Sequence, residues 1–510
     1  MSNLILDKKI WKTPLIDENG FVFEVQVLDY RPYDVELVKR SIKNLELGES
    51  KEIPCKAAAE EWANTFFFCE GGFEKNKPAN RQEALIIMEN FLYEYYIKGK
   101  EHPWKSINGH LTYQHYAAEF GFDIIGSEIG CVVKGYQMIM AFNRGAARQY
   151  GKPWFVDVSP WFDDWGMLDY SGQAIWGIAS GDTFGHSLSL FKRSYFMSYM
   201  SGACWIVAEG GGCNFFYPEL NSDGNYKISP LGEVGKEFND FAKANPDIGI
   251  PYTPFGIMLD FYHGTNYGSD FIKKAFEIFP YNDGDNLTWS LIDKFFPGSW
   301  FTWRRQETGF LTNSPYGDTC DIILQNASQE VINSYPVIIL SGDIDFKTEE
   351  VSRIMEYVSQ GGTLVINSSY LKFFPEIVKR DDRNRYDYDY KKGSIIVYGP
   401  DFYTVELDDI LTEITEKFIP FTISGKIEYI INVKNESIIL TLINNEGVKK
   451  ESRMLPIIDQ SKSQAIDIVY KGKSTVKWVK DLRTGQMLTT SANQTVTIAP
   501  GDLAIYEFGN

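Results

Sequence analysis

The sequence is poor in positive charge and in long apolar runs, and each shortage argues against a class of partner. Lys and Arg total 50 against 68 Asp and Glu, which gives a net charge of −18 and a pI near 4.9. Proteins that bind the phosphate backbone normally carry the opposite sign, so we predict no nucleic-acid partner. No window approaches the roughly 18 consecutive apolar residues of a membrane-spanning helix, so we predict no membrane partner.

The N-terminal segment, residues 1–20, also lacks the features of a signal peptide. Charged residues interrupt its apolar stretch, and it has no cleavage site of small residues. We therefore expect a cytoplasmic protein, or an exported one whose leader has been removed.

Motifs for metals and cofactors are missing as well. The six cysteines form no Cys-x-x-Cys pair and are expected to be buried thiols. The five histidines form no His-Glu-x-x-His motif, so we predict no metal site. There is no Gly-x-Gly-x-x-Gly, Walker A or Gly-x-Ser-x-Gly sequence, so we expect no cofactor and no serine nucleophile.

What is present is the composition of a globular protein, with 44 % hydrophobic and 23 % charged residues and a mean hydropathy of −0.25. At roughly 100–200 residues per domain, the length suggests about three domains. Aromatic residues make up 15 % of the chain. Exposed aromatic rings suit sugars, whose C–H faces stack on them.

Residues 1–250 alternate short apolar runs with longer helical patterns, which is typical of a parallel sheet covered by helices. The number of strand signals predicts a (β/α)8-type barrel. The expected helices are 81–99, 136–151, 186–202 and 230–244. The expected strands are 21–29, 64–72, 105–111, 122–130, 152–161 and 203–211, with a shorter candidate at 174–180.

The rest of the chain has two further textures. Residues 251–400 contain buried runs at 254–261, 320–326, 336–343, 362–369 and 394–399, which predict a flavodoxin-like α/β domain. Within it, the charged and Tyr-rich run 380–393 is expected to be a solvated loop. Residues 401–510 show short alternating strands separated by Asn and Gly turns, which predict an antiparallel β-sandwich.

Polar residues end several of the apolar runs of the predicted barrel. They are Glu70, His110, Glu128, Asp157 and Glu209. In a parallel barrel, such positions point into the catalytic mouth. Four of the five are carboxylates, and two carboxylates flanking a glycosidic bond are the usual requirement for its hydrolysis.

Two assignments of the catalytic pair are open. If 152–161 and 174–180 both lie between them, Glu128 and Glu209 end strands three apart and face each other as acid/base and nucleophile. If 203–211 is instead the eighth strand, Asp157 ends strand seven and becomes the nucleophile. In either case, an apolar setting is expected to keep Glu128 protonated.

Further side chains near these strand ends are candidates for binding the substrate. Glu70, His110 and His186 can hydrogen-bond sugar hydroxyls, and Asp164 lies in a loop that can reach the mouth. Trp154, Trp161 and Trp205 neighbour the candidate carboxylates and can stack on sugar rings.

The run at 228–264 resembles the passage from the catalytic barrel into the second domain of three-domain microbial β-galactosidases, and 334–369 is similar to that second domain. The resemblance implies a glutamine-amidotransferase-like fold without amidotransferase residues, a homo-oligomer such as a trimer, and a retaining hydrolase of clan A type. Such enzymes carry Asn-Glu at strand four, whereas Ser127 precedes Glu128 here. The resemblance therefore implies the architecture and reaction class, but not galactose specificity.

We thus expect a glycoside hydrolase that cleaves a plant or microbial oligo- or polysaccharide by a two-carboxylate, retaining mechanism. The alternative is a non-catalytic carbohydrate-binding or scaffold protein with a degenerate barrel site.

Overall fold

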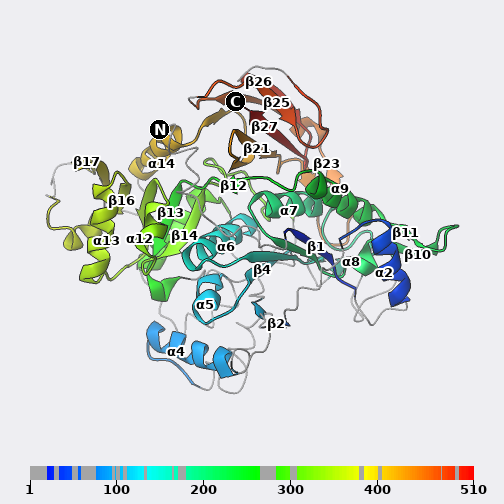
Figure 1. The fold of residues 1–510 in the computed structure, drawn as a ribbon, viewed down its shortest axis with the longest axis horizontal. Coiled ribbons are helices and arrows are strands. Elements are labelled where there is room, and N and C mark those ends of the chain that lie inside the picture. Colours follow the sequence, from blue (N-terminus) through cyan, green and yellow to red (C-terminus); the bar gives the residue numbers. More distant parts are fainter. Residues whose placement is uncertain are drawn as a thin grey trace.

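The computed structural model describes most of the chain, and Figure 1 shows its arrangement. The described residues are 20–27, 34–48, 56–58, 76–94, 98, 104–106, 112–130, 135–162, 166–170, 180–264, 283–298, 307–377, 384–399, 405–472, 474–488 and 493–509.

A parallel sheet forms the centre of the N-terminal half, in the order β1-β9-β5-β4. Its strands are β1 (Val22–Val25), β4 (Ile125–Ile129), β5 (Trp154–Val158) and β9 (Trp205–Ala208). Next to β4 lies β3 (Trp104–Ser106), which pairs in parallel with β2 (Lys56–Ala58). From β2 to β9, each strand therefore lies beside the next, and β9 also pairs with β1, as in the cyclic order of a barrel. The predicted strand at 64–72 lies outside the described residues.

The connection after β5 corrects the predicted spacing of the strands. β5 pairs directly with both β4 and β9, so one strand, not two, separates Glu128 from Glu209. Most of the candidate strand 174–180 lies outside the described residues. Its last residue belongs to β8 (Ser180–Gly181), in a small separate sheet with β6 (Trp161–Phe162) and β7 (Gly166–Leu168). The prediction that a strand at 174–180 stands between β5 and β9 is wrong, because its end pairs with β7 instead.

Helices cover this sheet, and polar caps fix where several of them begin. The Ser187 hydroxyl accepts a hydrogen bond from the Leu190 amide at the start of α7, and Ser229 does the same for Gly232 in α9. The helices are α2 (Val35–Asn44), α4 (Arg81–Leu92), α5 (Gln114–Glu119), α6 (Tyr136–Tyr150), α7 (Leu188–Met200), α8 (Gly211–Asn214) and α9 (Pro230–Ala244). A hairpin of β10 (Phe216–Leu220) and β11 (Tyr226–Ile228) precedes α9.

The middle of the chain forms a six-stranded sheet in the order β14-β13-β15-β16-β18-β17. The first five are parallel, in the doubly wound order expected of a flavodoxin-like unit, and β17 is antiparallel at the edge. The strands are β13 (Phe255–Leu259), β14 (Cys320–Leu324), β15 (Val337–Leu340), β16 (Thr363–Asn367), β17 (Arg385–Tyr390) and β18 (Gly393–Tyr398). The associated helices are α11 (Asp283–Phe295), α12 (Gln329–Asn333), α13 (Thr348–Ser359) and α14 (Val405–Phe418).

β17 corrects the expectation of a solvated loop over 380–393. Tyr386 is buried, and its ring contacts that of Tyr388. The run forms an edge strand that pairs antiparallel with β18. Its tyrosines stand at every second position, so they lie on one face of the sheet and the aspartates between them lie on the other.

The C-terminal part consists of two antiparallel sheets whose inner faces touch through Phe421, Tyr470 and Phe508. One sheet holds β12 (Ile250–Pro251), β20 (Glu428–Val433), β21 (Ser437–Ile443), β27 (Leu503–Gly509) and β25 (Trp478–Asp481). The other holds β19 (Phe421–Ile423), β24 (Gln464–Tyr470) and β26 (Asn493–Ile498). A short hairpin, β22 (Val448–Lys449) with β23 (Ile457–Ile458), projects from this part.

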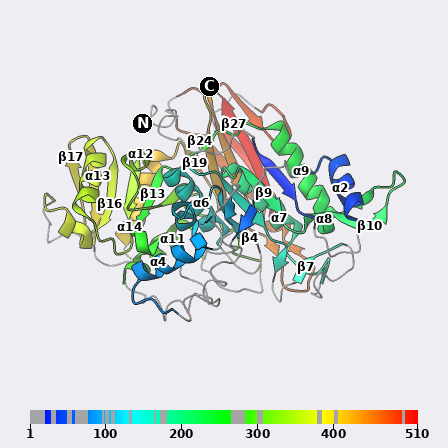
Figure 2. The same ribbon diagram turned by 60° about the horizontal axis from the view of Figure 1, so that its bottom comes forward.

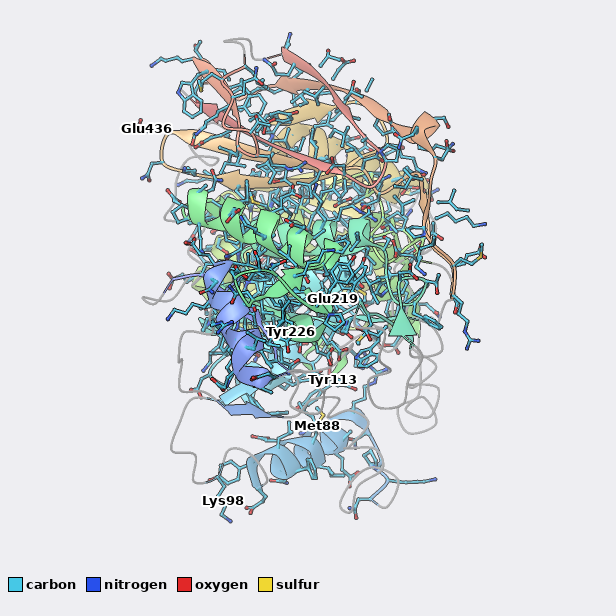
Figure 3. The ribbon with its side chains drawn as sticks, turned by 90° about the vertical axis from the view of Figure 1, so that its right-hand side faces the viewer. Met88, Lys98, Tyr113, Glu219, Tyr226 and Glu436 are labelled. Carbon is cyan, nitrogen blue, oxygen red and sulfur yellow. The ribbon has the colours of Figure 1, made fainter. Side chains whose placement is uncertain are left out.

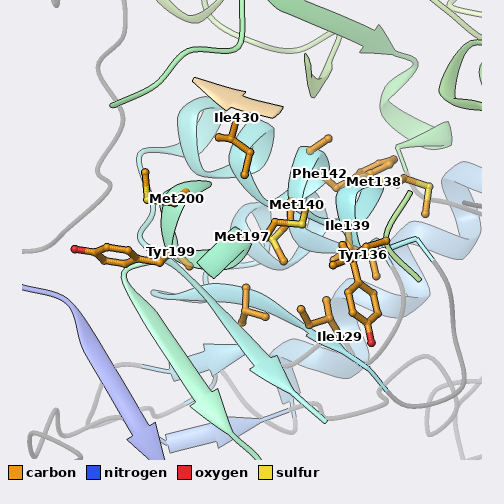
Figure 4. Packing of buried hydrophobic residues seen from close by; sticks show 14 of the residues in the cluster. Ile129, Tyr136, Met138, Ile139, Met140, Phe142, Met197, Tyr199, Met200 and Ile430 are labelled. Carbon is orange, nitrogen blue, oxygen red and sulfur yellow. The ribbon is translucent and has the colours of Figure 1, made fainter. Parts of the chain in front are cut away.

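α6 and α7 lie between the parallel sheet and the C-terminal sheets. Figure 4 shows Met140 of α6 and Met197 of α7 packed between Ile129 of β4 and Ile430 of β20. Figure 3 shows the same order from the side, with Glu436 at the β-rich end and Met88 of α4 at the opposite end. In Figure 2 the six-stranded sheet stands beside the parallel sheet. α6 is thus covered on more than one side, which explains why thirteen of its residues are buried.

α6 also closes the open edge of the six-stranded sheet. Gln149 accepts a hydrogen bond from the Leu324 amide at 2.8 Å, and Arg144 donates one to the Cys320 carbonyl at 2.9 Å. His115 of α5 contacts the Ile322 carbonyl at 3.0 Å. Side chains therefore satisfy backbone groups that an edge strand would otherwise expose.

Candidate active site

The side chains of the parallel sheet divide between two faces. Phe23 and Ile206 face the helices and belong to the large core of the molecule. Val22, Phe155 and Trp205 face the other way and belong to a small separate cluster. Because successive side chains of a strand point to opposite faces, the residue two positions after each of these three lies on the same face as they do.

One level along that face, the strand register places four residues in a row: Glu24, Val207, Asp157 and Glu128. Each is the penultimate residue of its strand, at the carboxyl end, where parallel barrels hold their reactive groups. Neighbouring strands are about 4.8 Å apart, so Asp157 and Glu128 are direct neighbours. Both are buried, at 7 % and 6 % exposure.

Glu209 lies just beyond this row, as the first residue after β9. Its amide donates a hydrogen bond to the Val158 carbonyl at 3.2 Å, which continues the parallel pairing past the end of the strand. Its carboxylate accepts a hydrogen bond from the Trp161 indole at 3.4 Å. The structure thus brings together two residues that the sequence assigned to catalysis and to substrate binding.

Two glycines, one near the start of β4 and one just after its end, stand in close contact with β5 and the residue that follows it. A Cβ at Gly126 would stand 2.3 Å from the Phe155 ring, on the inner face below Glu128. Gly130 has a φ of +105°, and a Cβ there would stand 2.3 Å from the Ser159 carbonyl oxygen. A side chain at either position would clash with β5 or Ser159, so glycine at both allows the close packing of β4 on β5 that accompanies the pairing of Glu128 with Asp157.

The other two predicted tryptophans do not lie at the mouth. Trp154 is fully buried in the large core, on the helix side of β5, where no sugar can stack on it. Trp205 lies on the inner face but one level below the carboxylates, packed with Val22 and Phe155. The expectation that Trp154 binds substrate is wrong, because it lies three positions before Asp157 and so points to the opposite face.

His186 is part of a buried charged cluster behind the site. Its Nδ1 lies 3.6 Å from Glu307, and its ring is 4.7 Å from that of Phe162, the residue after Trp161. The Ser187 amide and hydroxyl both donate hydrogen bonds to Glu307, at 2.7 and 2.5 Å. Burial by itself would raise the pKa of Glu307, but hydrogen bonding and charge from His186, with Arg193 and Ser187, lower it. His186 thus packs against Phe162, which follows Trp161 in β6.

The remaining predicted binding residues, Glu70, His110 and Asp164, lie outside the described residues. Sequence reasoning missed Glu24. The signal was present, since a single carboxylate interrupts the apolar run of the first strand at a position that alternates with Val22.

Within the described ranges, no group of three His, Cys, Asp or Glu side chains could hold a metal ion. None of the helices that the structure describes is long and apolar enough to cross a membrane.

No family model and no curated protein matches this sequence. Solved structures similar to this chain include β-galactosidases. One from Bacillus circulans sp. alkalophilus is 11 % identical, with a TM-score of 0.49, and the match covers 84 % of this chain and 67 % of that one. A catalytic mutant of Gan42B, a GH42 β-galactosidase from G. stearothermophilus, is 12 % identical, with a TM-score of 0.46 and the same coverages. The polyextremophilic β-galactosidase of the Antarctic haloarchaeon Halorubrum lacusprofundi is 8 % identical, with a TM-score of 0.48 and again the same coverages.

Proposed function

We propose that this protein is a glycoside hydrolase in which Asp157 and Glu128 form the catalytic pair. The observation that carries the proposal is the register that sets Asp157 directly opposite Glu128 on neighbouring parallel strands. A strand spacing of about 4.8 Å suits the roughly 5–5.5 Å between the carboxyl groups of retaining enzymes. This choice follows the second of the two assignments left open by the sequence.

Glu209 fits the pair less well. It stands two strands from Glu128, with Asp157 between them, and lies past the end of its strand. Its hydrogen bond to Trp161 suits a residue that contacts the sugar at the rim. We therefore assign Glu209 and Trp161 to substrate binding.

The reaction then runs in two steps. The Asp157 carboxylate attacks the anomeric carbon while Glu128 donates its proton to the departing glycosidic oxygen, which leaves a glycosyl ester on Asp157. Glu128, now a carboxylate, takes a proton from water, and the resulting hydroxide attacks the anomeric carbon and breaks the ester. Configuration is retained, and both carboxyl groups return to their starting states.

Kinetics on a panel of nitrophenyl glycosides and polysaccharides, followed by NMR of the product anomer, test this proposal. Asp157→Asn should lose activity on every substrate. Glu128→Gln should lose about 10²–10⁴-fold on poor leaving groups and less on activated aryl glycosides, which need little protonation. Glu219→Gln, an exposed change on β10, is the matched control and should behave as wild type.

Two outcomes would contradict the assignment. If Asp157→Asn stays active while Glu209→Gln is dead, the nucleophile is Glu209. If the protein binds oligosaccharides but cleaves none, the non-catalytic alternative holds.

We also propose an oligo- or polysaccharide substrate and a homo-oligomer, as the β-galactosidase resemblance implies. Light scattering at micromolar concentration should report a mass above the 58.3 kDa of one chain, with three chains as the expected number. A monomer would contradict the assembly.

A further inference from the structure

The first strand adds a third carboxylate that the two-step reaction does not use. Glu24 stands level with Asp157 and Glu128, separated from Asp157 by Val207 alone. Val22, two positions before it, belongs to the inner cluster, so alternation puts Glu24 on the same face as the catalytic pair.

Glu24 has no partner within the protein as far as the structure describes it. Its Oε2 atom is buried and makes no hydrogen bond with any described residue. None of the ion pairs among the described residues involves it. A buried carboxylate oxygen without a donor is costly, and at the mouth of a site a ligand can supply that donor.

The described strand positions beside Glu24 on the inner face carry negative charge and no positive charge. Along the inner face, the described positions of the four strands hold Glu24, Asp157, Glu128 and, one level on, Glu209, and no Lys or Arg. An ionised carboxylate only accepts hydrogen bonds, so it can hold a hydroxyl or an ammonium group. It repels a carboxylate or sulfate, and like charges brought together in this way cost affinity.

We propose that Glu24 binds hydrogen-donating groups of the sugar seated against the catalytic pair and makes the site select neutral or amino sugars over anionic ones. This inference rests on the proposed glycosidase function and names its substrate class. Glu24 takes no part in the bond-making steps; it is a specificity-determining residue.

The test compares three matched nitrophenyl glycosides at the same anomeric configuration: a neutral sugar, its 2-amino-2-deoxy form and its uronic acid. In wild type, kcat/KM should be highest for the neutral and amino sugars. Glu24→Gln keeps the size of the side chain but removes its charge. It should lower kcat/KM on the neutral sugar about tenfold, the loss expected of one hydrogen bond to a charged group.

The decisive quantity is the ratio of kcat/KM for the neutral sugar to that for the uronic acid. Glu24→Gln should lower this ratio at least about tenfold, because repulsion of the anion is relieved while a donor contact is weakened. Glu24→Asp keeps the charge and should keep the selectivity, and Glu219→Gln should leave the ratio at the wild-type value. A ratio that Glu24→Gln leaves unchanged would overturn the inference.

The neutral and amino arms separate the two donor groups. A preference of wild type for the amino sugar that Glu24→Gln abolishes identifies the ammonium group as the partner of Glu24. If wild type has equal kcat/KM on the neutral and amino sugars, and Glu24→Gln lowers both equally, the partner of Glu24 is a hydroxyl.

Failure of the proposed function would be visible separately. If wild type cleaves none of the three glycosides, the same sugars are tested for binding by saturation-transfer NMR. Weaker binding of the uronic acid that Glu24→Gln relieves would still support the role of Glu24. Equal binding of all three sugars would overturn it. Thermal unfolding of each variant confirms that it is folded before either assay is read.

Discussion

Replacing Arg144 with leucine should destabilise this protein far more than the loss of an ordinary ion pair. Arg144 is 1 % exposed and donates to both oxygens of Asp318, at 2.6 and 2.9 Å, and to Asp321 at 2.8 Å. It also donates to the Cys320 carbonyl at the edge of β14. These contacts join α6 to the six-stranded sheet, so their loss affects the junction between two parts of the molecule.

The expected magnitude follows from what is left behind. Removing one partner of a buried pair leaves an uncompensated buried charge, which typically costs about 3–5 kcal/mol. Arg148 still reaches Asp321 at 2.5 Å, so Asp318 bears most of the loss. We therefore expect the free energy of unfolding of Arg144→Leu to fall by about 3–5 kcal/mol at neutral pH.

The effect should also depend on pH with a definite sign. Burial already raises the pKa of Asp318 above its ordinary value of 3.8, and the attraction of Arg144 offsets this only in part. Without Arg144 the pKa of folded Asp318 rises further. Stability from a group whose folded pKa is raised is fully present below the unfolded pKa and is lost as pH rises through the folded pKa. The deficit of Arg144→Leu should therefore be largest at neutral pH and shrink toward pH 4.

Urea unfolding of the cooperative unit that contains α6 and β14, at pH 7.5 and at pH 5, measures both effects. Arg385→Leu removes surface pairs with the half-exposed Glu413 and Asp387 and should cost less than about 1 kcal/mol. The double change Arg144→Leu with Asp318→Leu removes both charges and should recover at least half of the loss. The reasoning would be refuted if Arg144→Leu lost no more free energy of unfolding than Arg385→Leu, or if its loss grew as the pH fell.

Three further changes test other parts of the structure. Gly145→Ala should lower the free energy of unfolding by at least about 1–3 kcal/mol, as overpacking does, because a Cβ there would stand 1.6 Å from the Ile322 carbonyl oxygen; an unchanged melting temperature would show that α6 does not lie on β14. Glu307→Gln should lower the free energy of unfolding at pH values above the ordinary glutamate pKa of 4.5, and by progressively less below it. The reason is that a lowered folded pKa gives stability that is lost on acidification. If the variant's unfolding midpoint falls below that of wild type by the same amount at pH 7 and pH 4, the charge pairing with His186 is contradicted. Lys450→Met should speed proteolysis within 448–458, because the Lys450 ammonium donates to the carbonyls of Thr183 and Met454, both at 2.6 Å; cleavage at the wild-type rate would mean that these bonds do not hold the hairpin.

Much of the candidate site was readable from local pattern. Glu128, Asp157 and Glu209 each close an apolar run, and the structure has a strand ending at each of those places. The helices that follow were readable too, because Ser187 and Ser229 are good caps placed directly before helical patterns. Two errors were avoidable with the same information. The separation between Trp154 and Asp157 is an odd number of residues, and the tyrosines of β17 recur at every second position, so alternation along a strand fixes the face of each.

What the sequence by itself determined about this protein is therefore local: which runs become strands and helices, where they end, and which side chains share a face. These follow from hydrophobic periodicity and from side chains that cap helices, which are signals contained within about ten residues of sequence. Only the tertiary structure decided which strands are neighbours. Six short parallel strands of similar composition can be ordered in many ways, and no local preference distinguishes a partner 50 residues away from one 180 residues away. The pairing of β9 with both β1 and β5 brings Glu24 into the row with Asp157 and places one strand, not two, between Glu128 and Glu209. That choice depends on the packing of the whole sheet against its helices, which is a property of the complete fold.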